Sequence, residues 1–219
     1  IGFGLRMIFF IILPAMLGLI LLRHPIVHLV FEHGSFTKAD TTATATALFC
    51  YAVGLWAFAG VRIIVSAFYS LQDTKTPAVT AGIAVGANIL LSLWLMTLLD
   101  AAGLALATAL ASMLNGSILV AVLHRRLGRV DWGSIVRSAV RVLGACVPVA
   151  LICLWVASAA VWTQDGEWMI KSAALFAGIG LSVLGYLGAH IMFGSEELDV
   201  VLGMVKRKFG RVTRKVGAA

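Results

Sequence analysis

The chain has 219 residues, of which 61% are hydrophobic and only 12% charged, and its formal net charge at pH 7 is +7. A soluble globular domain carries about 25% charged residues, so this composition excludes one soluble domain around a single buried core. The three cysteines lie in apolar blocks without disulfide or metal-binding spacing, and we expect them to be small buried hydrophobic side chains.

Long apolar blocks separated by short polar segments predict an all-α polytopic membrane protein with about six transmembrane helices. A bilayer core of about 30 Å needs roughly 20 apolar residues per helix. Pro14 interrupts the first block, and we expect a kink there, with neighbouring groups satisfying the freed carbonyl. The predicted blocks are, in order, 3–22, 42–69, 77–99, 104–123, 135–162 and 169–193.

The connecting segments have their own signals. Residues 25–31 predict a short interfacial helix before a turn at Gly34. Residues 70–77 predict a tight polar loop that places Pro77 in the first turn of the next helix. Residues 100–103 predict a short turn, and a basic loop follows the fourth block as far as residue 137.

The tail, residues 195–219, combines apolar residues at helical spacing with six lysines and arginines among residues 206–215. This pattern predicts a basic amphipathic helix on an anionic membrane surface. Nucleic-acid binding is the alternative, but a membrane-proximal cytoplasmic tail is expected to be basic in any case. We therefore expect membrane lipids as partners and no nucleic acid.

The loop charges predict the orientation. One side holds Arg6, Lys75, the arginines of 125–137 and the tail cations, whereas the other holds only Arg23, Lys38 and Lys171. Loops rich in Lys and Arg stay in the cytoplasm, so both ends of the chain are predicted to be cytoplasmic. Residues 23–41, 100–103 and 163–168 are then outside.

Arg62 is the one clear cation within a predicted span. A charge at that depth costs at least about 2.5–3.5 kcal/mol. Two interpretations are open: the side chain snorkels to an interface, or it faces a cavity and contacts an anionic substrate. We favour the second interpretation.

Polar residues also mark the third and fourth helices. Asn88 and Ser92 share one helix face, as do Thr108, Ser112 and Asn115. Interhelical hydrogen bonding is the common role for such residues, and an ion site is the alternative. Gly82 and Gly86 form a GxxxG pattern that favours close helix packing.

The sequence offers nothing that argues for an enzyme. It shows neither a nucleophile–base–orienter set nor a glycine loop that would cradle phosphate. The chain begins at Ile1 without an initiator methionine or the segment order of a signal peptide, so we expect an internal piece of a longer protein.

Three segments carry a family resemblance: 31–37 followed by Asp40-Thr41, then 51–55, then 68–77. Their order and spacing resemble the C-terminal half of the MurJ (MviN-type) lipid II flippases, of the multidrug/oligosaccharidyl-lipid/polysaccharide exporter superfamily. The resemblance covers most of residues 1–125. The motif residues are Gly34, Phe36, Asp73, Thr74, Thr76 and Pro77.

The resemblance implies a fold of two lobes around a cationic cavity. Residues 1–125 would be four helices of the second lobe, 126–194 two additional helices thought to form a groove for the lipid tail, and 195–219 the cytoplasmic tail. The implied function is alternating-access transport of lipid II, the undecaprenyl-pyrophosphate-linked peptidoglycan precursor, across the bacterial inner membrane for cell wall biogenesis. It would require the missing N-terminal helices of the same transporter.

The resemblance also implies roles for single residues. Arg62 matches a position where relatives can carry a basic residue facing the cavity. Asn88 and Thr108 match a sodium site of some relatives, although Ser92 stands where an acidic ligand would be. Sodium or the membrane potential would be the driving force, and no other cofactor is expected. Asp73, Thr74 and Thr76 would stabilise their turn through local hydrogen bonds.

Two other functions stay open. The chain could belong to another exporter of the superfamily, which carries a drug or a polyprenyl-linked polysaccharide; residues 68–77 argue against this. It could also be a membrane scaffold that transports nothing.

Overall fold

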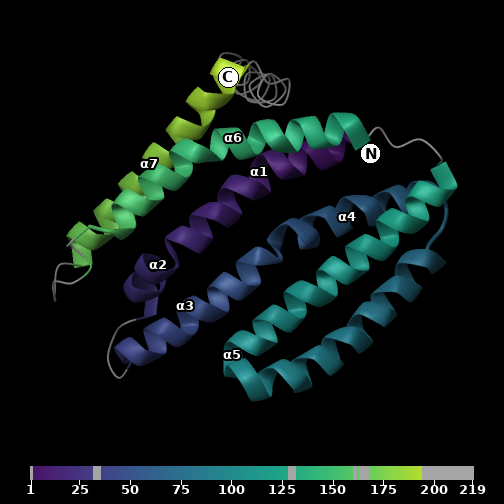
Figure 1. Cartoon of the computed structure of the whole chain (residues 1–219), viewed down its shortest axis with the longest axis horizontal. Helices are drawn as coiled ribbons and strands as arrows, with labels where there is room; N and C mark the ends of the chain where they lie inside the picture. Colours follow the sequence, from purple (N-terminus) through teal and green to yellow (C-terminus); the bar gives the residue numbers. More distant parts are fainter. Residues whose placement is uncertain (1, 32–35, 128–131, 160–161, 163–167, 194–219) are drawn as a thin grey trace, which may run out of the picture.

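The computed structural model describes residues 2–31, 36–127, 132–159, 162 and 168–193. These residues form α-helices and no strand, which confirms the all-α prediction. Figure 1 shows α1, α6 and α7 gathered on one side and α3, α4 and α5 on the other. The helices are α1 (Gly2–Leu21), α2 (Arg23–Phe31), α3 (Lys38–Val53), α4 (Leu55–Ser70), α5 (Lys75–Leu127), α6 (Trp132–Ala157) and α7 (Trp168–Phe193).

Helix α5 is a hairpin of two arms (Figure 1). The backbone leaves helical geometry at Asp100, with φ 49° and ψ −129°, inside the predicted turn. A Cβ atom on Gly103 would overlap the carbonyl oxygen of Leu95, so glycine lets the second arm pass close to the first. Five helical segments are long and apolar enough to cross a membrane. Because Lys75–Arg126 supplies two arms, about six spans are present, as predicted.

The predicted single helix at 42–69 is wrong in one respect, because Gly54 divides it into α3 and α4. A Cβ atom on Gly54 would lie 2.6 Å from Cβ and 2.7 Å from Cα of Ala109 on the second arm of α5. The absence of a side chain therefore permits a backbone approach that no other residue allows. The two helices together still form one apolar segment, Lys38–Ser70.

The predicted GxxxG contact is also wrong among the described residues. Nothing lies within 4 Å of a Cβ atom built on Gly82 or Gly86, and both face open space on the first arm of α5. On α7, by contrast, a Cβ atom on Gly178 would lie 2.6 Å from Val156 Cγ2 of α6. Close helix packing thus occurs at other glycines than those of the motif.

Pro14 lies inside α1 and has no N–H to donate to the carbonyl of Phe10, one turn earlier. The Tyr186 hydroxyl of α7 donates to that carbonyl at 2.6 Å. Tyr186 and Phe10 are both buried, at 6% and 4% exposure. The expectation that a neighbouring group satisfies the freed carbonyl is therefore confirmed.

Two apolar clusters hold the helices together, and α1 contributes to both. The larger cluster joins α1 and α2 to α6 and α7, with Phe10, Val149 and Tyr186 among its members. The smaller joins Leu5 of α1 to Phe68 of α4 and Leu119 of α5. The division into 1–125 and 126–194 stays a prediction, and α1 packs against α4 of the first part and α6 of the second.

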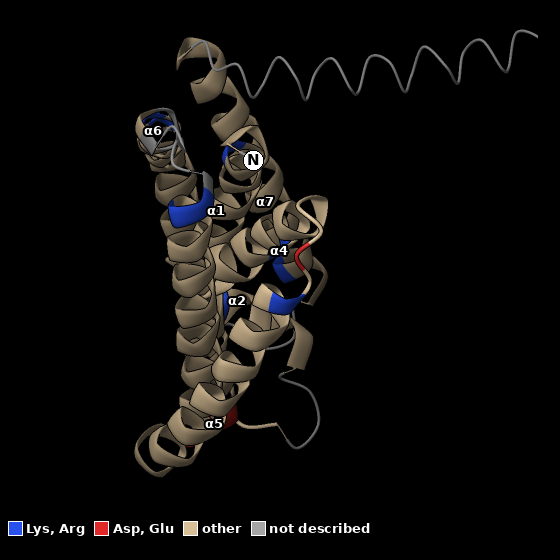
Figure 2. Ribbon diagram, turned by 90° about the vertical axis from the view of Figure 1, so that its right-hand side faces the viewer, with Lys and Arg blue, Asp and Glu red and all other residues tan. Residues whose placement is uncertain are grey.

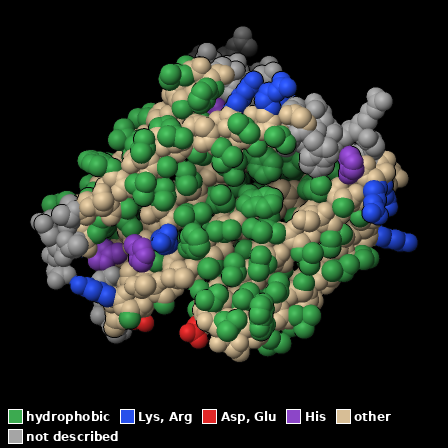
Figure 3. All heavy atoms as spheres, viewed as in Figure 1, with side chains coloured by type: hydrophobic (Ala, Val, Ile, Leu, Met, Phe, Trp, Pro, Cys, Tyr) green, Lys and Arg blue, Asp and Glu red, His purple; other side chains and the backbone are tan. Residues whose placement is uncertain are grey.

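Much of the outer surface is apolar. Figure 3 shows hydrophobic side chains spread over the visible face, and Figure 2 shows how few charged residues interrupt the helices. Trp155 is 71% exposed and Leu90 is 71% exposed. Exposed apolar area on this scale is typical of surfaces that contact lipid or other helices.

Two polar contacts join segments that the charge pattern places on a common side. Asp73, after α4, pairs with Arg126 at the end of α5, with 2.7 Å between Oδ2 and Nη1. Lys171 Nζ, near the start of α7, lies 2.9 Å from His28 Nε2 of α2. Each contact agrees with the predicted alternation of loops across the membrane.

Candidate functional site

Arg62 lies on the face of α4 that α1 and α5 leave open. The buried face of α4 consists of Ala57, Gly60, Ile64, Ala67 and Phe68, and it packs against α5 and α1. Arg62 is exposed and forms no hydrogen bond or ion pair with any described residue. The guanidinium therefore remains available for a group outside the described residues.

Other polar and aromatic side chains share this open face. Ser66 and Tyr69 follow Arg62 at one and two helical turns and are exposed. On the other side, Phe58 lies one turn before Arg62, and its ring stacks on that of Tyr51, with centroids 5.3 Å apart and an interplanar angle of 24°. Along α4, the exposed Arg62 thus has the half-buried Phe58 one turn before it and the exposed Tyr69 two turns after it.

The two candidate sodium ligands line one cavity of about 270 Å³ between α4 and the two arms of α5. Asn88 comes from the first arm and Thr108 from the second. The Thr108 hydroxyl donates to the Leu104 carbonyl at 2.9 Å, and its oxygen can still accept or coordinate. The remaining polar side chains of the cavity are Ser112 and Asn115. The structure thus brings the predicted pair together from separate arms.

Two details of this cavity affect how well it could bind an ion. The Asn115 Oδ1 atom is buried and has no hydrogen-bond partner among the described residues. Ser92 donates to Asn88 Oδ1 at 3.4 Å but does not line the cavity. All the lining polar groups are uncharged, so the described part of the cavity offers amide and hydroxyl oxygens only.

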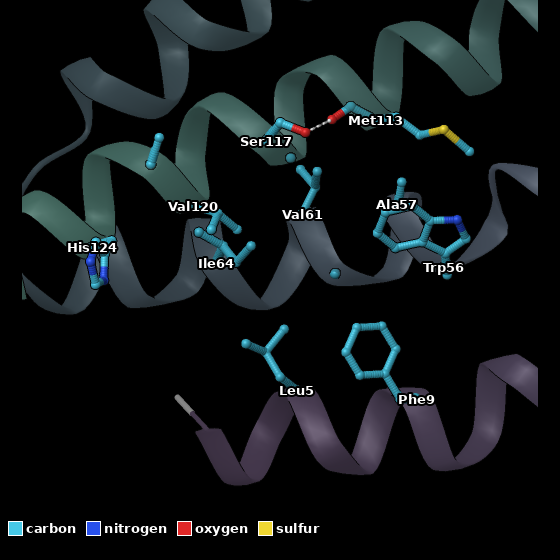
Figure 4. Close-up of a pocket in the computed structure, with 13 residues that line it drawn as sticks. Leu5, Phe9, Trp56, Ala57, Val61, Ile64, Met113, Ser117, Val120 and His124 are labelled. Carbon is cyan, nitrogen blue, oxygen red and sulfur yellow. Dashed lines mark hydrogen bonds between the residues drawn. The ribbon is translucent and has the colours of Figure 1, made fainter. Parts of the chain in front are cut away.

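A second cavity, of about 450 Å³, lies between α1, α4 and the second arm of α5 (Figure 4). Leu5 and Phe9 face Val61 and Ile64 across it, and His124 lies at one end. Ser117 is the other polar lining side chain, and its hydroxyl donates to the Met113 carbonyl at 2.8 Å. Arg62 does not line this cavity, whose chemistry suits hydrocarbon rather than a charged headgroup.

A third cavity, of about 440 Å³, runs between α1, α6 and α7. Pro14 and Gly18 line it from α1, Cys153 from α6, and Ser182 and Tyr186 from α7. The Cys153 thiol and the Ser182 hydroxyl lie 3.5 Å apart, so the few polar groups here have partners. The cavity therefore presents an apolar wall.

The predicted loop motif is a helix–helix junction. Two residues after the end of α4, Gln72 adopts the left-handed region, with φ 58°, and the Asp73 N–H donates to the Phe68 carbonyl at 3.0 Å. Asp73 in turn accepts from the Thr76 N–H at 3.0 Å and from its hydroxyl at 2.6 Å. Local hydrogen bonds of Asp73 and Thr76 thus stabilise the turn, as predicted. The predicted part of Thr74 is not found, because its side chain is exposed and forms no hydrogen bond with a described residue. Pro77 is buried in the first turn of α5.

Arg126 completes this junction from the far end of α5. Its guanidinium contacts Asp73 at 2.7 Å and Thr76 Oγ1 at 3.5 Å. The pKa of the Asp73 carboxyl lies below its ordinary value of 3.8, first because Thr76 donates two hydrogen bonds and then because Arg126 is near. The sequence signal for Arg126 was only its place in a basic loop, which did not identify this partner.

The first segment of the resemblance begins α3. Thr37 caps the helix: its hydroxyl accepts from the Asp40 N–H, and the Asp40 carboxylate accepts from the Thr37 N–H at 2.9 Å. The Phe36 ring packs against Phe31 with centroids 6.1 Å apart. This part of the motif is structural. Gly34 and the tail 195–219 lie outside the described residues.

Comparison with known proteins gives a consistent result. The family model described as "Lipid II flippase MurJ" matches residues 1–176. A probable lipid II flippase MurJ of Vibrio cholerae serotype O1 is 35% identical over 204 residues, which are 90% of this chain and 38% of that protein. A protein of the same description from Rhizobium meliloti is 30% identical over 209 residues, 90% of this chain and 37% of its own length.

A solved structure agrees with the sequence relatives. The chain is similar to a lipid II flippase MurJ in an inward closed conformation, with a TM-score of 0.68 and 25% identity, over 86% of this chain and 37% of that one. The chain thus spans less than two fifths of the length of these relatives.

Proposed function

We propose that this chain, which belongs to the lipid II flippase MurJ family, works as the C-terminal part of a larger flippase that carries lipid II across the membrane. The relatives it matches are more than twice as long, so the helices preceding this segment would complete the transporter. The observation that carries the proposal is Arg62, which is exposed on the open face of α4, inside the apolar segment Lys38–Ser70.

The proposed role of Arg62 is to bind the pyrophosphate of lipid II. A cation left against lipid would cost at least about 2.5–3.5 kcal/mol, so the open face of α4 belongs beside water or an anionic ligand. Arginine presents a planar fork of donors that matches phosphate oxygens in pairs. The lobes would rock about this site and expose it to each side of the membrane in turn.

The isoprenoid tail of lipid II would stay in an apolar environment throughout. The cavity between α1, α6 and α7 has an apolar wall. This arrangement supports α6 and α7 as part of the tail groove. The separation of charged and apolar surfaces matches the two chemical parts of a polyprenyl pyrophosphate.

Asn88 and Thr108 are the proposed sodium ligands, because they line one cavity from opposite arms of α5. Oxygen ligands suit a hard cation such as sodium, although a neutral set binds it more weakly than one with a carboxylate. Ser92 supplies no such carboxylate. The membrane potential is the alternative driving force for the transport cycle.

The proposed location is the bacterial inner membrane, with the C-terminus in the cytoplasm. The excess of lysine and arginine in the loop at Lys75 and the segment around Arg125 and Arg126 supports this orientation. Membrane lipids and the preceding helices of the transporter are the other expected partners.

The test is Arg62→Ala in the full-length flippase that contains this segment, with lipid II translocation measured in proteoliposomes. We expect a large loss of translocation at normal expression, and partial recovery in Arg62→Lys, which keeps the charge without the fork. Arg141→Ala removes an exposed arginine from α6 and is the matched control. Translocation at the wild-type rate in Arg62→Ala would exclude the proposed binding role.

A second experiment separates lipid II from other exporter substrates. The full-length gene should restore growth to a bacterial strain depleted of its lipid II flippase. Failure to restore growth, with the protein present in the membrane, would favour a different substrate.

A further inference from the structure

We propose that the stacked rings of Tyr51 and Phe58 form a carbohydrate-binding platform that holds the sugar adjoining the pyrophosphate of lipid II. The inference rests on the proposed function and adds a subsite to it. Arg62 would hold the phosphates, and the aromatic pair would hold the first sugar ring.

The stack depends on the break between α3 and α4. Tyr51 and Phe58 are seven residues apart, which on a continuous helix is a rise of about 10 Å. Their ring centroids nevertheless lie 5.3 Å apart, with the rings inclined by only 24°. Gly54 divides the helices between them, and its contact with Ala109 keeps the break in place. The close backbone contact thus fixes the aromatic pair.

The outer ring of the pair remains accessible. Tyr51 is 46% exposed, whereas Phe58 is half-buried and also lines the cavity of Asn88 and Thr108. Phe58 therefore supports Tyr51 from the protein side and leaves the Tyr51 ring accessible from outside. The Tyr51 hydroxyl forms no hydrogen bond with a described residue.

An aromatic belt at the membrane interface does not explain Tyr51. Such belts place tyrosine where its hydroxyl reaches water or headgroups. Tyr51 instead lies near the middle of the 33-residue apolar segment Lys38–Ser70. A phenol hydroxyl facing hydrocarbon at that depth loses its hydrogen bonds at a cost of about 1–3 kcal/mol. Its position favours a polar ligand or a wet cavity.

A sugar ring can interact with both the aromatic face and the hydroxyl of Tyr51. The negative face of an aromatic ring attracts the weakly positive C–H groups of a pyranose, and the phenol can exchange hydrogen bonds with sugar hydroxyls. Phe58 and Arg62 are four residues apart, a rise of about 6 Å. A sugar joined directly to a pyrophosphate would therefore reach the platform while its phosphates contact Arg62.

The test compares two ligands that differ by the sugar. Binding of lipid II and of undecaprenyl pyrophosphate, which lacks it, would be measured on the full-length flippase in nanodiscs. For Tyr51→Leu we expect about three- to tenfold weaker binding of lipid II, in line with aromatic stacking energies, and unchanged binding of undecaprenyl pyrophosphate. Tyr51→Trp should keep the affinity for lipid II.

The control is Trp155→Leu, which removes a still more exposed aromatic ring from α6 and should change neither affinity. An equal loss for both ligands in Tyr51→Leu, or no loss for lipid II, would overturn the platform. Arg62→Ala should weaken the binding of both ligands. If Arg62→Ala changes the affinity for neither ligand while Tyr51→Leu weakens the binding of lipid II alone, the role proposed for Arg62 fails and the platform stands.

Discussion

The hydrogen bond from Tyr186 to the Phe10 carbonyl gives the sharpest stability prediction. Tyr186→Phe removes the donor and keeps the ring, which packs against Phe10 and His190 with centroids 5.4 Å and 4.6 Å away. The carbonyl is then left unsatisfied, because Pro14 cannot donate to it. A buried acceptor without a partner costs about 1–3 kcal/mol, whereas hydrogen bonds in membrane proteins average about 0.6 and reach about 1.7 kcal/mol. We expect a loss of about 1–2 kcal/mol.

Restoring the missing helix donor should remove most of this cost. Pro14→Ala supplies an N–H one turn after Phe10, so the carbonyl can accept a bond within α1. The assay is unfolding of the purified full-length protein by SDS titration in mild detergent, for wild type, both single variants and the double variant. The double-mutant cycle should give a coupling free energy of about 1 kcal/mol.

The cycle can refute the reasoning. If Tyr186→Phe costs the same in the wild-type and Pro14→Ala backgrounds, the hydroxyl does not serve the carbonyl that proline frees. Ser182→Ala removes another hydroxyl from α7, at 6% exposure, whose partner is Cys153. Its cost should be equal in both backgrounds, which makes it the control for a general effect of Pro14→Ala.

Three further predictions test the helix break at Gly54, the junction at Asp73 and the proposed ion cavity. Gly54→Ala should destabilise the fold by about 1–3 kcal/mol, the range for overpacking, because its Cβ atom would lie 2.6 Å from that of Ala109; Ala109→Gly should recover part of the loss in the same unfolding assay. Because the pKa of Asp73 is lowered by Thr76, its contribution to stability is complete above the ordinary pKa and is lost as the pH falls through the lowered one. The melting temperature of wild type should therefore fall more than that of Asp73→Asn on going from about pH 5 to about pH 2, and parallel curves would contradict this. Sodium at about 100 times its dissociation constant should stabilise the full-length protein by about 2.7 kcal/mol over potassium, and Asn88→Ala and Thr108→Ala should abolish that difference; an undiminished sodium effect in both variants would place the ion elsewhere.

Much of the helix pattern could be predicted because transmembrane helices depend on local composition. Runs of about 20 apolar residues are sufficient to indicate a span, and the reversal at Asp100 falls inside the short turn predicted at 100–103. The break at Gly54 could not be predicted in this way. It arises from contact with Ala109, on a different helix, and nothing in the local sequence distinguishes Gly54 from Gly82 and Gly86, which face open space.

The partners of polar side chains were harder to predict than their positions. The position of Arg62 follows from its place in an apolar block, whereas the pairing of Asn88 with Thr108 came from the family resemblance. The cavity that Asn88 and Thr108 share depends on how the two arms of α5 meet. Arg126 and Tyr186 were not predicted as partners of Asp73 and Phe10. Each pair joins segments far apart in sequence, so only the folded arrangement of helices reveals it.

Whether a polar group has a partner within the chain suggests how to separate structural polar groups from functional ones among the described residues. The Phe10 carbonyl has its donor within the chain, and Asp73 has Thr76 and Arg126, so the fold itself explains why these groups are present. Arg62 and the Tyr51 hydroxyl have no such partner among the described residues. Because an unmatched charge or hydroxyl is costly at membrane depth, their partners must come from water, from protein outside the described residues or, under the proposed function, from the substrate. Binding measurements with and without the sugar distinguish the last of these sources from the other two.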